Sequence, residues 1–157
     1  IDNLKSVFVL IMILFLVGAL AGTWLVSGII PAMVYYGLQV LTPSIFLPAS
    51  VVIAALISIA TGSSWTTSAT VGIALVGIGT ALGIPTGMIA GAVISGAYFG
   101  DKMSPLSDTT NLAPAMAGTD LFTHIRYMTI TTVPTIIITN FKASNCLYAS
   151  SKNFIYY

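Results

Sequence analysis

The chain has 157 residues, of which 57% are apolar and only 6% are charged, and its mean hydropathy is +1.01. A soluble domain usually carries about a quarter charged residues, so this composition excludes an ordinary cytosolic globular protein. The net charge of +1 provides no basic face for nucleic acid, and the single cysteine, Cys146, excludes an internal disulfide and a thiol-rich metal site.

Residues 6–100 contain no Asp, Glu, Lys, Arg or His. A helix that spans a bilayer needs roughly 20 apolar residues, so this stretch has room for about four crossings. We therefore predict an all-α polytopic membrane protein with several membrane helices.

Small and polar residues divide the first part of this stretch. We expect a helix from Val7 to about Ala21, a weakened segment over 22–31, and a second helical piece to Leu41. The weakened segment is interrupted at Gly22-Thr23-Trp24, at Ser27-Gly28 and at Pro31. The turn TPS at 42–44 ends this piece.

The next apolar runs are interrupted by a segment rich in hydroxyl groups. A run over 46–60 leads into TGSSWTTS at 61–68, and further runs follow over 69–82 and 86–100. Gly79, Gly83, Gly87 and Gly91 recur every four residues, a spacing that favours close helix packing in membranes.

The charges resume at Asp101, within the second polar break, GDKMSPLSDTTN at 100–111. A short half-helix bent by Pro114 is expected over 112–117, and a polar or interfacial helix is expected to start over 120–126. The apolar run at 128–139 is too short to cross a bilayer alone. From Asn140 the composition becomes polar, which predicts a transport domain over 1–139 and a tail over 140–157 that is unstructured or foreign to the fold.

The two polar breaks are the candidate ion site. Irregular backbone is tolerated at membrane depth only where it lines a protein cavity, and transporters coordinate Na⁺ with unwound carbonyls and hydroxyls. Na⁺, like other hard cations, prefers oxygen ligands. The candidate residues are Ser63, Ser64, Trp65, Thr66 and Thr67 in the first break, and Asp101, Ser107, Asp108, Thr109, Thr110 and Asn111 in the second.

The carboxylates of Asp101 and Asp108 are the strongest candidates, because an ionisable group in a membrane segment is costly and indicates function. One carboxylate that binds either H⁺ or Na⁺ is sufficient to exchange the two ions. We expect Asp108, Thr109 and Ser64 to bind Na⁺. Two alternatives stay open: Asp101 forms a surface ion pair with Lys102, or Asp108 caps a half-helix that starts at Thr109.

The sequence GDKMSPLSDTTNLA at 100–113 resembles the signature of the NhaC family of bacterial Na⁺/H⁺ antiporters, which includes Na⁺-coupled malate/lactate antiporters. SSWTTSATVG at 63–72 and GTW at 22–24 are similar to the same family. The resemblance covers roughly residues 10–138 and implies a secondary antiporter with an inverted-repeat fold in the bacterial inner membrane. It also implies an ion site with Asp101, Ser107, Asp108, Thr109 and Thr110 on one side and Ser64, Trp65 and Thr66 opposite.

The resemblance further implies that Na⁺ and H⁺, or malate and lactate, are the transported partners and that no cofactor is needed. The sequence contains no nucleophile–base pair or His-rich metal spacing, so we do not expect an enzyme. Family members are longer, so we expect a C-terminal-half fragment whose complete protein forms a homodimer. The alternatives are an inactive truncated fragment and a small membrane scaffold.

Overall fold

The computed structural model describes residues 8, 11–12, 15–16, 18–19, 22–24 and 26–154, and every regular element in this part is a helix. The helices are α2 (Ile29–Val40), α3 (Phe46–Thr61), α4 (Ser64–Ala69), α5 (Val71–Ala81), α6 (Thr86–Met103), α7 (Asp108–Ala117) and α8 (Leu121–Phe154). The prediction of an all-α chain is therefore confirmed for the described residues. Within those same residues, no helix is at once long enough and apolar enough to cross a membrane.

Glycine and proline residues determine where several helices begin and end. α3 ends at Thr61 and is followed by Gly62, whose φ of 70° lies in the left-handed region that glycine adopts without steric cost. α6 begins directly after Pro85, a residue that has no N–H group to satisfy. The two predicted breaks are shorter than the sequence indicated: residues 64–68 form part of α4, so only 62–63 interrupt the helices in the first break, and only 104–107 do so in the second.

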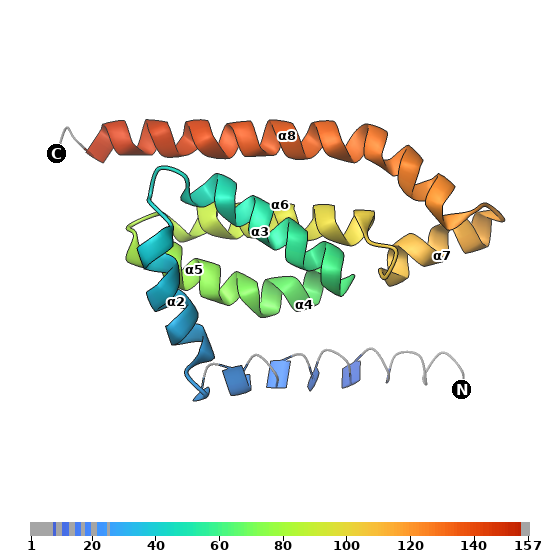
Figure 1. Ribbon diagram of the computed structural model, residues 1–157, viewed down its shortest axis with the longest axis horizontal. Helices are drawn as coiled ribbons and strands as arrows, with labels where there is room; N and C mark the ends of the chain where they lie inside the picture. The colour runs from blue at the N-terminus through green and yellow to red at the C-terminus, as the bar shows by residue number, and fades with distance from the viewer. Residues whose placement is uncertain are drawn as a thin grey trace.

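Helices α3 to α6 pack into a bundle, and α8 runs along one side of it next to α6 (Figure 1). α2 packs on α5 at one end of the bundle, whereas α7 lies at the other end (Figure 1). Phe46, Val51 and Ile89 are fully buried in the core. Both breaks fall at the α7 end, so the fold brings the segments around 61–64 and 101–108 together (Figure 1).

Two glycines allow the backbones of α3 and α6 to touch. A Cβ atom added to Gly96 would collide with the Val51 carbonyl, and one added to Gly100 would collide with the Ala55 carbonyl. These obstacles are backbone atoms, which cannot rotate away as a side chain does. Gly96 and Gly100 are therefore the positions where the helix crossing excludes any larger residue.

The predicted glycine ladder is largely wrong. Gly79 packs closely against the side chains of Phe46 and Ile89, but a Cβ at Gly83, Gly87 or Gly91 would meet nothing within 4 Å. The reason is that the four residues do not share a helix: Gly83, with a φ of 77°, lies in the turn between α5 and α6. The regular spacing therefore does not form a single face.

The N-terminal break lies within the weakened segment predicted over 22–31. The chain turns at Ser27 and Gly28, one of the predicted interruptions, where glycine has a φ of 80° just before α2, whereas 22–24 is helical. The helix expected from Val7 to Ala21 falls largely outside the described residues, although its described positions are helical.

α8 is longer than the short apolar segment that the sequence predicted. Its first turn is capped by Asp120, whose Oδ2 accepts a hydrogen bond from the Thr123 N–H at 3.1 Å. The helix then continues through Phe154, whereas an unstructured tail was expected from Asn140. A polar composition does not prevent a helix, because the hydrogen bonds of a helix are made by the backbone. The domain boundary near 139 stays a prediction.

Candidate ion site

The carboxylate of Asp101 joins the two polar breaks. Ser64 Oγ, at the first residue of α4, donates to Asp101 Oδ2 at 3.1 Å, and Ser107 Oγ, just before α7, donates to Asp101 Oδ1 at 2.7 Å. Asp101 is half-buried in the last turn of α6, whereas Ser64 and Ser107 are 5% and 1% exposed. Residues from both breaks therefore meet on one carboxylate.

The second break adds further hydroxyl groups to this cluster. Thr109 Oγ1 lies 3.0 Å from Ser107 Oγ, and because Ser107 donates to Asp101, Thr109 is the donor in this pair. Thr110 Oγ1 donates to the Asp101 carbonyl at 3.1 Å, so it binds the backbone beside the carboxylate and not the carboxylate itself. Thr109 is consequently the outermost member of a chain of oxygens that leads to Asp101.

Three predicted site residues of the first break stabilise α4 instead. Ser63 Oγ caps this helix by accepting from the Thr66 N–H at 3.2 Å and from the Thr66 hydroxyl at 3.1 Å. Thr67 Oγ1 donates to the Ser63 carbonyl at 2.9 Å. The structure therefore does not bring Ser63, Thr66 or Thr67 to Asp101. Trp65 is 69% exposed.

Asp108 is placed differently from Asp101. It is the first residue of α7 and is exposed, and its carboxylate has no hydrogen-bond or ion-pair partner among the residues that the structure describes. The hypothesis that Asp108 caps a helix starting at Thr109 is wrong by one residue, because the extended backbone of Ser107 makes Ser107 the N-cap. Asn111, also exposed, donates through Nδ2 to the carbonyls of Pro105 and Ser107 at 2.7 and 2.8 Å and so shapes the loop.

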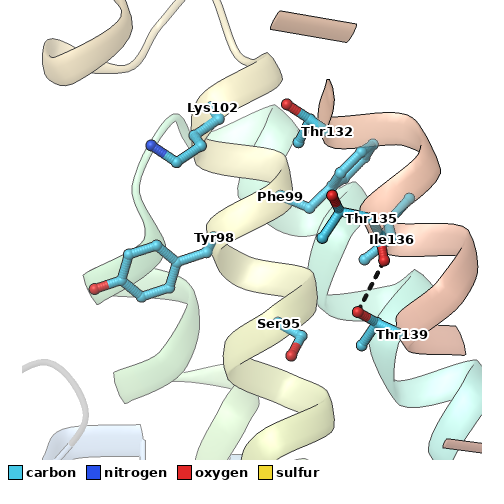
Figure 2. A pocket seen from close by; sticks show the side chains of 8 residues that line it. All are labelled: Ser95, Tyr98, Phe99, Lys102, Thr132, Thr135, Ile136 and Thr139. Atoms are coloured by element: carbon cyan, nitrogen blue, oxygen red, sulfur yellow. Dashed lines mark hydrogen bonds between the residues drawn. The ribbon is translucent and has the colours of Figure 1, made fainter. Parts of the chain in front are cut away.

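The alternative of an Asp101–Lys102 ion pair is not found in the structure. Asp101 is paired with hydroxyl groups, and Lys102, on the next position of α6, is exposed and has no anionic partner within the described part of the chain. Figure 2 shows the Lys102 amino group turned away from α8. The carboxylate is therefore not neutralised by its neighbouring cation.

A groove of about 240 Å³ lies between α6 and α8, apart from the Asp101 cluster (Figure 2). The Thr132, Thr135 and Thr139 hydroxyls donate to carbonyls within α8, so they present no free donor to a ligand. None of the predicted site residues lines it; its lining consists of Ser95, Tyr98, Phe99, Lys102, Thr132, Thr135, Ile136 and Thr139.

Two buried serines near the site were not predicted. Ser58 Oγ donates to the Ala97 carbonyl at 2.6 Å, and Ser104 Oγ donates to the Ile59 carbonyl at 2.7 Å. Both side chains are 0% exposed. The signals available in the sequence were the two serines, Ser50 and Ser58, in the otherwise apolar run at 46–60, and a serine directly before Pro105.

The Asp101 cluster gathers oxygen atoms, the ligand type that hard cations prefer. It offers the two carboxylate oxygens and the hydroxyl oxygens of Ser64, Ser107 and Thr109, and hydroxyl oxygens retain lone pairs while they donate. The described residues contain no group of three or more His, Cys, Asp or Glu side chains of the kind that holds a transition metal.

Comparisons with known proteins identify the family of the chain. A family model described as the Na⁺/H⁺ antiporter family matches residues 1–137. The chain is 52% identical over 139 residues to the Na⁺/H⁺ antiporter NhaC of Alkalihalophilus pseudofirmus. The matched segment covers 88% of this chain and 30% of that protein.

Two further relatives carry other transport names. The malate-2H⁺/Na⁺-lactate antiporter of Bacillus subtilis is 50% identical over 82% of this chain and 28% of its own length. The arginine/ornithine antiporter ArcD of Halobacterium salinarum is 50% identical over 75% of this chain and 24% of its own length. The chain thus spans less than a third of each relative, and no solved structure shows a significant match. The family match over most of its length shows that the chain belongs to the Na⁺/H⁺ antiporter family, as its resemblance to the NhaC family predicted.

Proposed function

We propose that this chain forms the ion-binding part of a secondary antiporter that exchanges Na⁺ for H⁺ across the bacterial inner membrane. The observation that carries the proposal is the convergence of Ser64 and Ser107, from separate helix breaks, on the single carboxylate of Asp101. The family match and the low charge content of the chain support it.

In the proposed exchange, the Asp101 carboxylate binds Na⁺ with the hydroxyl oxygens of Ser64, Ser107 and Thr109 as neutral ligands. A proton bound to the same carboxylate removes the negative charge that attracts the cation, so the two ions compete for one site. The site opens alternately to the two sides of the membrane, as in other secondary transporters with broken helices. Protons that move down their gradient thereby drive Na⁺ out.

The second carboxylate, Asp108, has a subordinate part in this scheme. The sequence analysis placed Na⁺ on Asp108, Thr109 and Ser64, but the Asp108 carboxylate is exposed, while the Ser64 hydroxyl donates to Asp101. We therefore assign the shared carboxylate to Asp101 and keep Thr109 and Ser64 as ligands.

An exchange of organic acids is the second candidate, because a relative that is 50% identical over 129 residues is named a malate-2H⁺/Na⁺-lactate antiporter. In this version the carboxylate site couples Na⁺ or H⁺ to malate and lactate, and other parts of the complete protein select the anion. Uptake of labelled malate into vesicles, with and without a Na⁺ gradient, distinguishes the two candidates. Malate uptake that depends on Na⁺ favours the second.

The test of the ion site compares Asp101→Asn with Asp108→Asn. Asparagine preserves the size of the side chain and removes the charge, so Asp101→Asn is expected to abolish Na⁺-dependent proton movement, whereas Asp108→Asn reduces it by less than tenfold. Proton movement is measured with a pH-sensitive dye in everted membrane vesicles. Because the chain spans 30% of its NhaC relative, residues 1–137 are also tested in place of the matching segment of that protein.

Asp120→Asn is the matched control, because Asp120 caps α8 and lies outside the cluster. Membrane insertion of each variant is measured by immunoblotting of the same vesicles. If Asp101→Asn inserts normally and exchanges Na⁺ at the parent rate, the shared-carboxylate mechanism is wrong.

A further inference from the structure

Two serines outside the oxygen cluster connect the helices that carry it. Ser58 belongs to α3 and donates to the Ala97 carbonyl in α6, while Ser104 follows α6 and donates to the Ile59 carbonyl in α3. The bonds run in opposite directions between the same two helices and involve neighbouring residues of α3. Together they fix both the sliding and the rotation of α3 against α6.

Each bond has a clear physical reason. α3 ends at Thr61, so the Ile59 carbonyl has no partner farther along the helix, and the Ser104 hydroxyl satisfies it. Ser104 Oγ also accepts from the Leu106 N–H at 3.2 Å and thereby shapes the turn that leads to Ser107. The bond from Ser58 to the Ala97 carbonyl requires a glycine at position 100, since a Cβ there would lie 2.5 Å from the Ser58 Cβ.

The two bonds join α3 and α6 a few residues away from the donors of the ion site. The chain runs directly from Ile59 through the first break to Ser64, and from Ser104 through a short turn to Ser107. Ser64 and Ser107 are the two donors to Asp101. A shift of α3 along α6 would therefore change the distance between Ser64 and the carboxylate.

We propose that Ser58 and Ser104 are positioning residues that set the Na⁺ affinity of the Asp101 site without contacting the ion. The proposal rests on the proposed function for the identity of the ion. Neither side chain has a hydrogen bond to the Asp101 carboxylate, and both hydroxyl protons are used by carbonyls. Their effect on the ion is therefore geometric.

The test compares Ser58→Ala and Ser104→Ala with Ser50→Ala and Ser95→Ala. Ser50 is also 0% exposed on α3, but it donates to the Phe46 carbonyl of its own helix, and Ser95 on α6 donates to the Gly91 carbonyl of its own helix. The control variants thus remove a hydroxyl group from the same helices without removing a bond between them. Each variant is inserted in vesicles, and Na⁺-dependent proton movement is measured at a series of Na⁺ concentrations.

We expect Ser58→Ala and Ser104→Ala each to raise the KM for Na⁺ by about fivefold, the size of effect that one interhelical hydrogen bond has in a membrane. Vmax for each inserted molecule is expected to stay within about twofold of the parent, and the control variants are expected to leave KM unchanged. Ser104→Thr, which retains the hydroxyl group, is expected to restore the parent KM. A merely structural role would lower the amount of inserted protein and Vmax and leave KM unchanged.

A second measurement does not depend on transport. With Cys146 replaced by serine, nitroxide labels are attached at the exposed positions Leu56 of α3 and Ile94 of α6, and their distance distribution is measured by pulsed electron spin resonance. Ser58→Ala and Ser104→Ala are expected to broaden the distribution, whereas Ser50→Ala is not.

The possible results separate this proposal from the proposed function. An unchanged distance distribution in Ser58→Ala and Ser104→Ala overturns the positioning role, and so does a broadened distribution with an unchanged KM. Normal exchange in Asp101→Asn overturns the proposed function instead, whatever the labels report.

Discussion

Gly100 provides a sharp test of the packing that holds the site together. An alanine at this position would place its Cβ in collision with the Ala55 carbonyl, 2.5 Å from the Ser58 Cβ and 2.8 Å from the Ile59 nitrogen. All three obstacles belong to the rigid part of α3. The helices must therefore separate to admit the methyl group.

The magnitude follows from opposing contributions. Overpacking of a close contact typically costs about 1–3 kcal/mol, and strain on the Ser58–Ala97 hydrogen bond adds roughly 1 kcal/mol. Replacing glycine by alanine inside a helix returns roughly 0.5–1 kcal/mol. We expect Gly100→Ala to lower the free energy of unfolding by about 1–3 kcal/mol.

Gly91 is the matched control because it lies in the same helix and is exposed. A Cβ there meets nothing within 4 Å, so Gly91→Ala should raise the free energy of unfolding by roughly 0.5–1 kcal/mol. Both variants are unfolded with urea in detergent micelles and followed by far-ultraviolet circular dichroism. Equal stability of Gly100→Ala and the parent, or an equal loss in Gly91→Ala, would refute the close crossing of α3 and α6.

The remaining predictions concern helix caps and the site. Asp120→Ala should lower the free energy of unfolding by about 1 kcal/mol, because the Thr123 N–H loses its acceptor. Asp120→Ser should retain most of this stability, because serine also caps helices. Urea unfolding measures both variants, and equal losses would contradict the capping role of Asp120. Ser63→Ala should cost a similar ~1 kcal/mol by uncapping α4 and leave the KM for Na⁺ within about twofold, since Ser63 does not bind Asp101. Ser64→Ala should instead raise that KM about tenfold, because a hydrogen bond to a charged group is worth roughly 1.5–3 kcal/mol and Asp101 is partly exposed. A larger KM change in Ser63→Ala than in Ser64→Ala would contradict the assignment of Ser64 to the ion site and of Ser63 to the helix cap.

Periodicity and local breakers predicted much of the helical structure. The runs at 46–60 and 86–100 correspond to α3 and α6, which end within a few residues of the predicted positions. Gly62 and Pro85 act locally, through φ and the missing N–H, so their effect is readable from the sequence.

The glycine ladder shows where this reasoning reaches its limit. The spacing predicts which residues share a face only if one helix continues through all of them. Gly83 lies in a turn, however, and Gly87 belongs to a different helix from Gly79. The two glycines of α6 that lie against the backbone of α3, Gly96 and Gly100, have the same four-residue spacing. Only the position of α3 distinguishes the two sets.

The carboxylates show the same limit within the site. Asp101 and Asp108 are both acidic residues in one polar break, and the sequence analysis favoured Asp108 for Na⁺. The direction of each side chain depends on where α6 ends and α7 begins. Because α6 continues to Met103, Asp101 lies in its last turn within reach of Ser64, whereas Asp108 starts α7 and faces outward.

The sequence by itself determined the low charge content, the helical class, the two polar breaks and the family, because these depend on composition, local backbone preference and a specific motif. The tertiary structure decided which residues of the two breaks meet, since the hydrogen bonds of Ser64 and Ser107 to Asp101 join residues from different breaks. It also decided that Ser58 and Ser104 lie at the helix crossing beneath that site. Contacts of this kind depend on how α3 packs against α6, and the pattern of one chain segment does not contain that information.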